Sequence, residues 1–420
     1  MRMSAILLFT NIILSLLLGG CKPEPLPPLP PPPPPTNESP LKILWQTPLT
    51  ADTMNEITGS PCFVDDNGYV VFYTSWTLPS AQVAKADGQT GNVIWRYNAY
   101  ADGFSEQQIM SVGDGVVIHN WRYVDILNSN GVLLWKNKIE EPGGALPRTN
   151  VIGDHFYSSH FSGPLPYCTS MSIVRSHYSQ LSWDTLVTIH TENDGFFVTL
   201  EPPTLWMNPQ GDSVLIIRDG GVRKTGSFNN GKNRASLYAF NLKTRTFDWV
   251  KKNMDVGGAI AVAQPCIVGS MIYINGVSTL YCIDLNTGNT IWQKEFPVSI
   301  LPGNVTVHKD IAMIPSSQEG LWGVDRFTGQ ILWTNNDVDG TVLESKCFDG
   351  VFYCTSTGYA RLYAVNAETG ATIWKERSPN RNSRHPNASF AFAGIAIDTV
   401  NRKLYTADKY YLMCIALPEK

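Results

Sequence analysis

The sequence LYCIDLNTGNTIW, at residues 280–292, is the clearest copy of a unit that recurs along this chain. An apolar segment runs into Asp284, the dipeptide Thr287-Gly288 follows, and a second segment ends at Trp292. Apolar alternation on both sides of a Thr-Gly pair predicts a β-hairpin, because glycine adopts the positive φ that a tight turn requires. The stretch therefore predicts two antiparallel strands, with a large aromatic side chain on the second.

The same pattern returns at a nearly constant spacing. Further copies end at Trp95, Trp135, Trp183, Trp249, Trp333 and Trp374. The intervals from Trp249 through Trp292 and Trp333 to Trp374 are 43, 41 and 41 residues. A period near 40 residues with several short strands per unit is typical of a β-propeller or solenoid. A tryptophan at one fixed position of each unit predicts docking between adjacent blades, where it buries about 150–250 Å².

Each unit contains more than the hairpin. Another apolar run precedes it, as at residues 69–73, 116–119, 271–274 and 351–354. With one further innermost strand before that run, each unit has four strands. The sequence thus predicts an all-β fold made of four-stranded antiparallel blades.

The two ends of the chain together supply one more unit. Residues 412–417 match residues 280–285, but the chain then stops without the turn or the tryptophan strand. The missing strand is found at the other end, around Trp45. Pairing of the N- and C-terminal strands would close a ring and leave no free sheet edge. This predicts an eight-bladed propeller; seven blades is the alternative, because the unit containing Trp183 is the most divergent.

The first forty residues are predicted to lie outside the propeller, which we place at 41–420. Residues 1–20 combine Arg2, an apolar run and small residues before Cys21, as in a bacterial lipoprotein signal peptide. We expect cleavage before Cys21 and lipid attachment to it; the alternative is an ordinary signal peptide with an incidental cysteine. In the segment 21–40, ten of the thirteen residues from 23 to 35 are proline, which favours a stiff polyproline II spacer or a ligand for proline-binding modules.

Composition excludes several classes of protein. Hydrophobic residues make up 43% of the chain and charged residues 16%, which excludes global disorder. The formal net charge is −4, from 32 Lys and Arg against 36 Asp and Glu. That balance argues against a nucleic-acid-binding protein, since such proteins carry an excess of basic residues.

The motif Asp-x-x-Thr-Gly-x-x-x-Trp resembles the repeat of the PQQ-type, or quinoprotein-like, β-propeller family, over nearly all of residues 41–417. With a lipoprotein-type N-terminus and eight predicted blades, the chain also resembles the BamB-like lipoproteins of the outer-membrane β-barrel assembly machinery. This resemblance implies a lipid-anchored envelope protein that binds a protein partner. An aspartate after the lipidated cysteine would suggest inner-membrane retention; Lys22 stands there, which favours the outer membrane.

An enzyme is the alternative that the same family raises. Family members that bind PQQ typically carry two adjacent cysteines and carboxylate and amide ligands for calcium. Here the cysteines after Cys21 stand at positions 62, 168, 266, 282, 347, 354 and 414, none of them adjacent. Cys282 and Cys414 fill the place that Ala239, Gly323 and Ala364 fill in other units, which favours packing. With no His-x-x-x-His or Cys-x-x-Cys spacing, we expect no catalytic residue, cofactor or metal site.

Basic residues gather in loops on the face that lies opposite the Thr-Gly turns in a four-stranded blade. An insert from 218 to 234 and a between-blade loop from 375 to 385 supply Arg218, Arg223, Lys224, Lys232, Arg234, Arg377, Arg381 and Arg384. Loops carry function more often than the scaffold beneath them. Basic clusters on an acidic protein predict a surface that steers an acidic partner; the alternative is that these loops are merely solvated.

These features predict a monomeric, non-enzymatic interaction scaffold in the cell envelope of a diderm bacterium. It would contact the membrane through its N-terminal lipid, bind a protein partner and bind no nucleic acid. Two other readings stay open: a surface-exposed lipoprotein that binds glycans or host proteins, which the long proline spacer would suit, and a quinoprotein-like enzyme with an axial site. The periplasmic and the exterior side of the outer membrane are both compatible with the sequence.

Overall fold

The computed structural model describes residues 41–418 except 50–58, 75–79, 101–107, 120–122, 139–147, 163–168, 178–183, 191–194, 198–202, 220–221, 225–233, 256–264, 277, 299, 301–303, 317–318, 341 and 392. Every helix or strand in this part of the chain is a β-strand. The described residues therefore contain no helix that could span a membrane. The expected lipidation site, the spacer, Trp183 and Lys232 lie outside the described residues.

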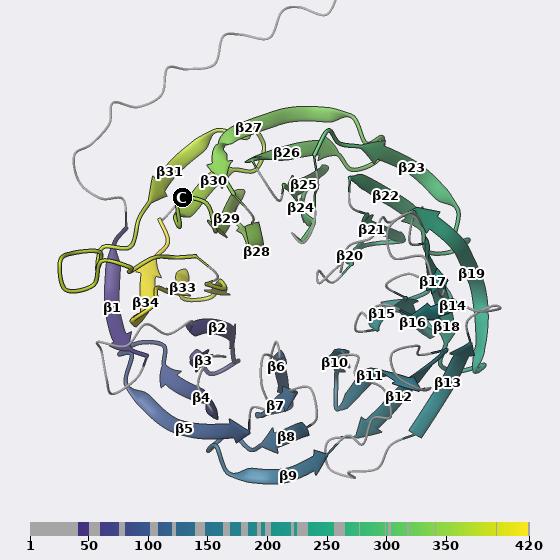
Figure 1. The fold of residues 1–420 in the computed structure, drawn as a ribbon, viewed down its shortest axis with the longest axis horizontal. Helices are drawn as coiled ribbons and strands as arrows, with labels where there is room; N and C mark the ends of the chain where they lie inside the picture. The colour runs from purple at the N-terminus through teal and green to yellow at the C-terminus, as the bar shows by residue number, and fades with distance from the viewer. Residues whose placement is uncertain are drawn as a thin grey trace, which may run out of the picture. The chain divides into compact units, whose positions relative to one another are not determined.

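The strands form eight antiparallel sheets, which follow one another around a ring (Figure 1). Three sheets come first along the chain. The first contains β2 (Gly59–Val64), β3 (Tyr69–Thr74), β4 (Ser80–Asp87) and β5 (Val93–Tyr100). The second contains β6 (Gln108–Val112), β7 (Gly115–His119), β8 (Tyr123–Leu127) and β9 (Leu133–Lys138). The third contains β10 (Arg148–Ile152), β11 (His155–Ser162), β12 (Ser170–His177) and β13 (Asp184–His190).

Three regular sheets form the later part of the ring. The fifth contains β20 (Cys266–Val268), β21 (Met271–Asn275), β22 (Thr279–Asp284) and β23 (Thr290–Glu295). The sixth contains β24 (Thr306–His308), β25 (Ile311–Pro315), β26 (Glu319–Asp325) and β27 (Ile331–Asp339). The seventh contains β28 (Val342–Phe348), β29 (Val351–Ser356), β30 (Leu362–Asn366) and β31 (Thr372–Glu376). The prediction of an eight-bladed propeller is confirmed.

The fourth blade departs from the regular pattern. Its four main strands are β15 (Thr204–Met207), β16 (Ser213–Arg218), β18 (Arg234–Asn241) and β19 (Thr246–Asp255). Two short strands extend it: β17 (Val222–Lys224) pairs with β18, and β14 (Gly195–Phe197) pairs with β17. The segment from 218 to 234 was predicted to be one loop. That prediction is wrong, because the segment starts in β16, contains β17 and ends in β18.

The eighth blade is shared between the ends of the described chain. It contains β32 (Ala396–Asp398), β33 (Lys403–Ala407), β34 (Tyr411–Ala416) and, outermost, β1 (Ile43–Pro48). The antiparallel register places Trp45 opposite Cys414 and Thr47 opposite Leu412. In Figure 1 the purple strand β1 lies beside the yellow strand β34. The N-terminal strand thus supplies the fourth strand that the C-terminal unit lacks.

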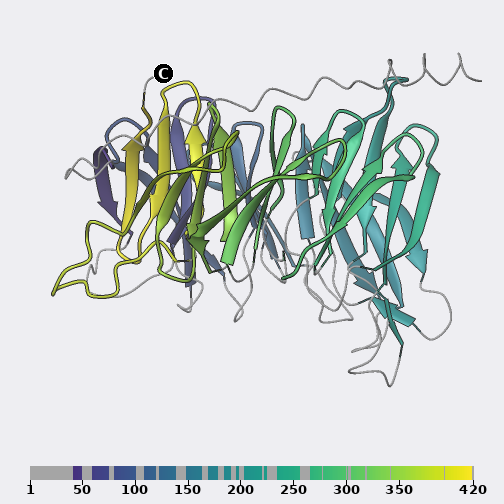
Figure 2. The same ribbon diagram turned by 90° about the horizontal axis from the view of Figure 1, so that it is seen from above.

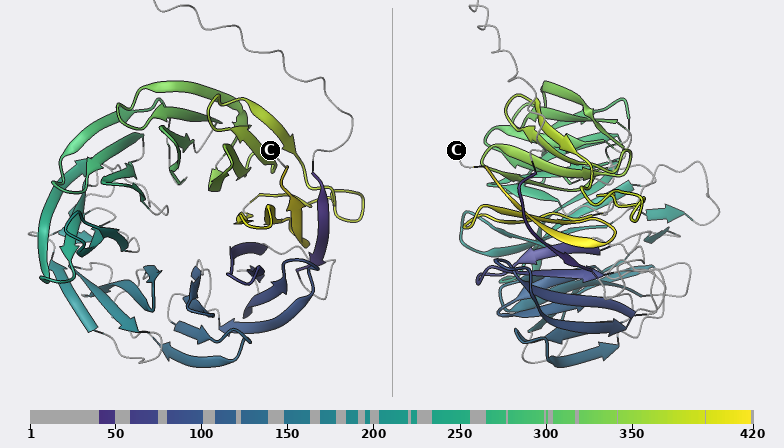
Figure 3. Two further views of the ribbon diagram at one scale, coloured as in Figure 1. Left: turned by 180° about the vertical axis from the view of Figure 1, so that it is seen from behind. Right: turned by 90° about the vertical axis from the view of Figure 1, so that its left-hand side faces the viewer.

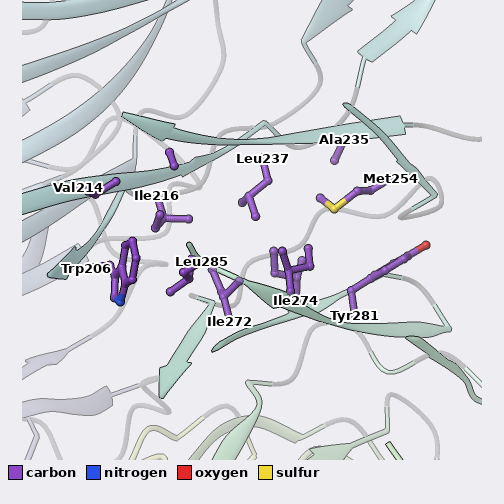
Figure 4. Packing of buried hydrophobic residues seen from close by; sticks show 12 residues of the cluster. Trp206, Val214, Ile216, Ala235, Leu237, Met254, Ile272, Ile274, Tyr281 and Leu285 are labelled. Atoms are coloured by element: carbon purple, nitrogen blue, oxygen red, sulfur yellow. The ribbon is translucent and has the colours of Figure 1, made fainter. Parts of the chain in front are cut away.

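The apolar core lies between blades. In one cluster, Ile216 and Leu237 lie on the face of the fourth blade that meets the fifth blade. They pack there with Ile272 and Ile274 of the fifth blade. Figure 4 shows these two rows of side chains facing each other. All four side chains are at most 1% exposed. Since truncating such a side chain costs about 2–5 kcal/mol, each blade is stabilised chiefly by its neighbours.

The repeated tryptophans lie on the outermost strands and contact the next blade. Four indoles donate to turn carbonyls there: Trp45 to Gly88 at 3.2 Å, Trp95 to Ser129 at 3.0 Å, Trp249 to Leu285 at 2.6 Å and Trp292 to Arg326 at 3.0 Å. Trp135 packs on Phe156, and Trp374 packs in the cluster of Leu41. Trp333 lies against Gly370, which has φ +72°. Each of these contacts links one blade to the following one.

The buried cysteines pack as small apolar side chains. Cys282 pairs across the sheet with Trp292 in the place where Gly323 pairs with Trp333. A Cβ atom at Gly323 would come within 2.1 Å of that indole, so this position accepts only a small residue. Burial raises the pKa of Cys282 to about 11 and of Cys414 to about 12.

We expect these thiols to react slowly with iodoacetamide in the native protein. At neutral to mildly alkaline pH, a pKa near 11 leaves about a hundredfold less thiolate than an unfolded chain has, and thiolate is the reactive form. Peptide-level mass spectrometry at Cys282 and Cys414, with the urea-unfolded chain as the control, measures the ratio of rates. Equal labelling of the native and unfolded chains would show that these cysteines are reactive rather than packed.

Candidate interaction surface

The hairpin order gives the propeller two chemically different faces. The Thr-Gly turns and the turns between first and second strands lie on one side, here called the turn face. Loops from second to third strands, and loops from one blade to the next, lie on the other side, here called the loop face. Figure 2 shows the segment after β31 and the strands β14 and β17 projecting on the same side, with the C-terminal end on the other. Figure 3 shows the same separation from a third direction.

The turn face uses its polar residues to hold its own backbone. The Oδ1 atom of Asp325 accepts from the backbone amides of Phe327 at 3.0 Å and Thr328 at 2.8 Å. Asn366 makes the equivalent bonds in the next blade. In the first blade, the hydrogen bond from the Thr90 amide lowers the pKa of Asp87. These acceptors are already satisfied by local donors, as expected for turn residues.

The predicted basic insert contributes less surface than its sequence indicates. Arg218 is only 3% exposed, and its Nη2 atom donates to the carbonyl of Asn275 in the fifth blade at 2.8 Å. The prediction that Arg218 contacts a partner is wrong, since its side chain lies between two blades. Arg223 and Lys224 lie in β17, and Arg234 begins β18. Their proposed role in partner binding stays a prediction.

The segment 377–395, between β31 and β32, is the basic loop that the structure describes most fully. Arg377, Arg381 and Arg384 are all exposed, and the segment contains no Asp or Glu. None of these three guanidinium groups forms an ion pair with a carboxylate of the described residues. The three predicted residues are therefore brought onto one stretch of the loop face with their charges available.

Polar anchors fix the first half of this arginine loop. Asp408, which is 2% exposed, accepts from Ser378 Oγ at 2.6 Å and from Asn380 Nδ2 at 2.8 Å through its Oδ2 atom. Its Oδ1 atom accepts from the backbone amides of Tyr410 and Tyr411. A buried carboxylate with four donors holds the loop against the turn between β33 and β34, since breaking any of these bonds would leave a buried charge under-satisfied.

Aromatic and apolar contacts fix the rest of the loop. The His385 ring lies 4.3 Å from that of Tyr410 and edge-on to Tyr411. Phe390 is fully buried in the core of the last two blades. Asn382 Oδ1 accepts from the amides of Arg384 and His385, at 2.8 and 3.0 Å, which closes a tight bend between the exposed arginines.

Two contributors to this surface were not predicted from the sequence. Asp408 is 28 positions from Asn380 and 30 from Ser378, so no local pattern links them. Tyr359, in the turn between β29 and β30, is 62% exposed, an unusual position for so large a ring. The dipeptide Gly358-Tyr359, between two predicted strands, could have indicated an exposed ring, because an aromatic side chain in a turn has no core to pack into.

The described residues do not fit a PQQ and calcium site. No three His, Cys, Asp or Glu side chains of this part of the chain lie close enough together to hold a metal ion. The cysteines of the described residues, at positions 62, 266, 282, 347, 354 and 414, are not adjacent in sequence.

A family model described as outer membrane protein assembly factor BamB matches residues 250–335, which run from the middle of β19 to the middle of β27. The resemblance to PQQ-type propellers is confirmed. The match includes the copies that end at Trp292 and Trp333. No curated protein matches by sequence.

Solved structures with similar folds agree with a β-propeller. BamB from Moraxella catarrhalis has a TM-score of 0.59 at 16% identity, covering 89% of this chain and 99% of its own. Quinohemoprotein alcohol dehydrogenase from Comamonas testosteroni has a TM-score of 0.65 at 12% identity, covering 90% and 78%. The C-terminal WD40 domain of Sif2 has a TM-score of 0.57 at 10% identity, covering 90% and 99%. Since these similar chains include an enzyme and a WD40 domain, they show a shared fold alone.

Proposed function

We propose that this protein is a non-enzymatic, lipid-anchored envelope scaffold that binds a protein partner on the loop face of its propeller. The observation that carries the proposal is the arginine loop, 377–395, which presents three exposed guanidinium groups that form no ion pair within the part of the chain that the structure describes. The match of residues 250–335 to the BamB family model supports a role in outer-membrane protein assembly. The proposed site for the lipid is Cys21, at the end of the predicted signal peptide.

Site-specific photocrosslinking in cells tests the choice of face. A photoreactive amino acid at Ser383, exposed between Arg381 and Arg384, should form an adduct with a protein of the envelope. The matched control is Asn286, exposed in a Thr-Gly turn on the turn face, where we expect no adduct. Mass spectrometry of the adduct identifies the partner. An adduct at Asn286 and none at Ser383 would mean that the partner binds the opposite face.

The variant Cys21→Ala tests the anchor. Without the cysteine no lipid can be attached, and the described residues contain no helix that could span a membrane. The variant should therefore move from the detergent phase to the aqueous phase in a Triton X-114 partition, while Cys62→Ala should stay in the detergent phase. A Cys21→Ala protein that still partitions into detergent would rule out the proposed lipidation.

A further inference from the structure

We propose that Arg377, Arg381, Arg384 and Tyr359 form one docking site for an extended acidic segment of a protein. This inference rests on the proposed function and gives the chemistry of the partner.

The turn that carries Tyr359 is tied to the arginine loop. The backbone amide of Phe390 donates to the carbonyl of Ala360 at 3.2 Å. In β29, the strand that leads into this turn, Thr355 Oγ1 donates to the carbonyl of Ala393 at 2.6 Å. These two hydrogen bonds fasten the turn of the seventh blade to the last part of the loop, next to the eighth blade.

Tyr359 is itself held in place. Its backbone amide donates to Asp339 Oδ1 at 3.1 Å, and the same carboxylate oxygen accepts from Ser356 Oγ at 2.6 Å. The Arg361 guanidinium lies 5.5 Å from the centre of the Tyr359 ring, within cation–π range. Tyrosine and arginine are among the residue types that are enriched at the positions contributing most to binding in protein interfaces.

Pairing distinguishes the three arginines from other basic residues. On the turn face, Lys243 pairs with Asp212 and Lys309 pairs with Glu368. Just before the loop, Lys375 forms an ion pair with Asp337 at 2.9 Å, so this carboxylate already has a basic partner. Burial raises the pKa of Glu376, the acid that directly precedes the loop. Asp408, beneath the loop, already accepts four hydrogen bonds. The guanidinium groups of the loop therefore lack internal carboxylates among the described residues, and an acidic partner would supply them.

The form of the loop favours a carboxylate-bearing peptide over a lipid surface. Its exposed positions are polar residues and prolines, whereas its apolar residues Ala388, Phe390 and Ile395 are buried. Membrane-surface segments insert exposed apolar side chains between lipid headgroups, and the described part of this loop has none. Planar guanidinium groups bind carboxylates through two parallel hydrogen bonds. A backbone that is already ordered loses little entropy on binding.

The test uses the full-length protein in uncharged detergent and a fluorescein-labelled peptide of alternating aspartate and glycine with a central phenylalanine. Fluorescence anisotropy should show binding that weakens as salt is added. The triple variant Arg377→Glu, Arg381→Glu, Arg384→Glu should weaken it by about tenfold or more, and Tyr359→Ala by less. The matched control, Lys42→Glu, Lys243→Glu, Lys309→Glu, changes the net charge equally on the turn face and should stay within about twofold.

Three outcomes would overturn the inference: no peptide binding by the wild type, equal losses in the two triple variants, or binding to phosphatidylglycerol vesicles in place of the peptide. Equal melting temperatures of both triple variants and the wild type exclude unfolding as the cause of a loss. The crosslink at Ser383 separates the two proposals. A protein adduct there without peptide binding contradicts only the acidic-segment inference, whereas peptide binding without an adduct contradicts the proposed function.

Discussion

Deletion of residues 41–48 is expected to lower the free energy of unfolding by about 4 kcal/mol or more. The deletion removes β1, and with it the ladder to β34 and the indole of Trp45 between two blades. It also removes the bond from Trp45 Nε1 to Gly88 and that from Thr47 Oγ1 to Gly91, at 3.2 and 2.6 Å. Loss of an apolar side chain of this size alone costs about 3–5 kcal/mol.

Urea unfolding followed by tryptophan fluorescence, extrapolated to water, measures this change. The control is a deletion of residues 28–35, which removes the same number of residues from the proline-rich segment before the propeller. We expect the control to unfold like the wild type. Identical midpoints for the two deletions would mean that the first strand contributes nothing to the stability of the ring.

The substitution Gly370→Ala is expected to cost about 3 kcal/mol or more. Gly370 has φ +72°, and an added Cβ would lie 2.4 Å from Trp333 Cε3. Gly211→Ala is the matched control, because Gly211 has φ +80° but no atom within 4 Å of an added Cβ. It carries only the backbone cost, about 1–2 kcal/mol.

The difference between the two melting temperatures or urea midpoints isolates the contact between the turn and the indole. The control should account for the strain at positive φ, so any excess in Gly370→Ala comes from displacing Trp333. If the two variants are equally destabilised, the tryptophan has room to move and the docking contact is not specific for glycine.

Most of the fold could be predicted from the sequence, because a repeat shows the same local rule several times. Thr287-Gly288 and Trp292 predict a turn and an aromatic strand wherever they recur, and the split blade follows from the unmatched ends. Glycine is required in this turn for a second reason, which was not predicted. The tryptophan of the preceding blade lies so close that no larger residue fits. That contact joins residues such as Trp333 and Gly370, which lie in different units of the repeat.

The interaction surface could be predicted only in part, since its chemistry depends on contacts between blades. Arg381 and Arg384 were found from charge alone, because loop arginines without acidic neighbours stand out in the sequence. Arg218 looked the same in sequence, yet it is buried, because β16 continues to that residue and the next blade offers the carbonyl of Asn275. Asp408 gave no signal, because the groups that it holds are far away along the chain.

The split eighth blade has a consequence for biosynthesis. Among the described strands β1 comes first along the chain and pairs with β34, which comes last, so the ring cannot close before β34 is available. Contacts between such distant segments form slowly, and the waiting strand leaves an unpaired edge that other chains can bind. A chain that lacks β34 cannot complete this blade. Its strands β1 and β33 would then each leave an unpaired edge that proteases and chaperones can bind. Completion of the last strand is therefore the step that separates a finished molecule from a substrate for quality control.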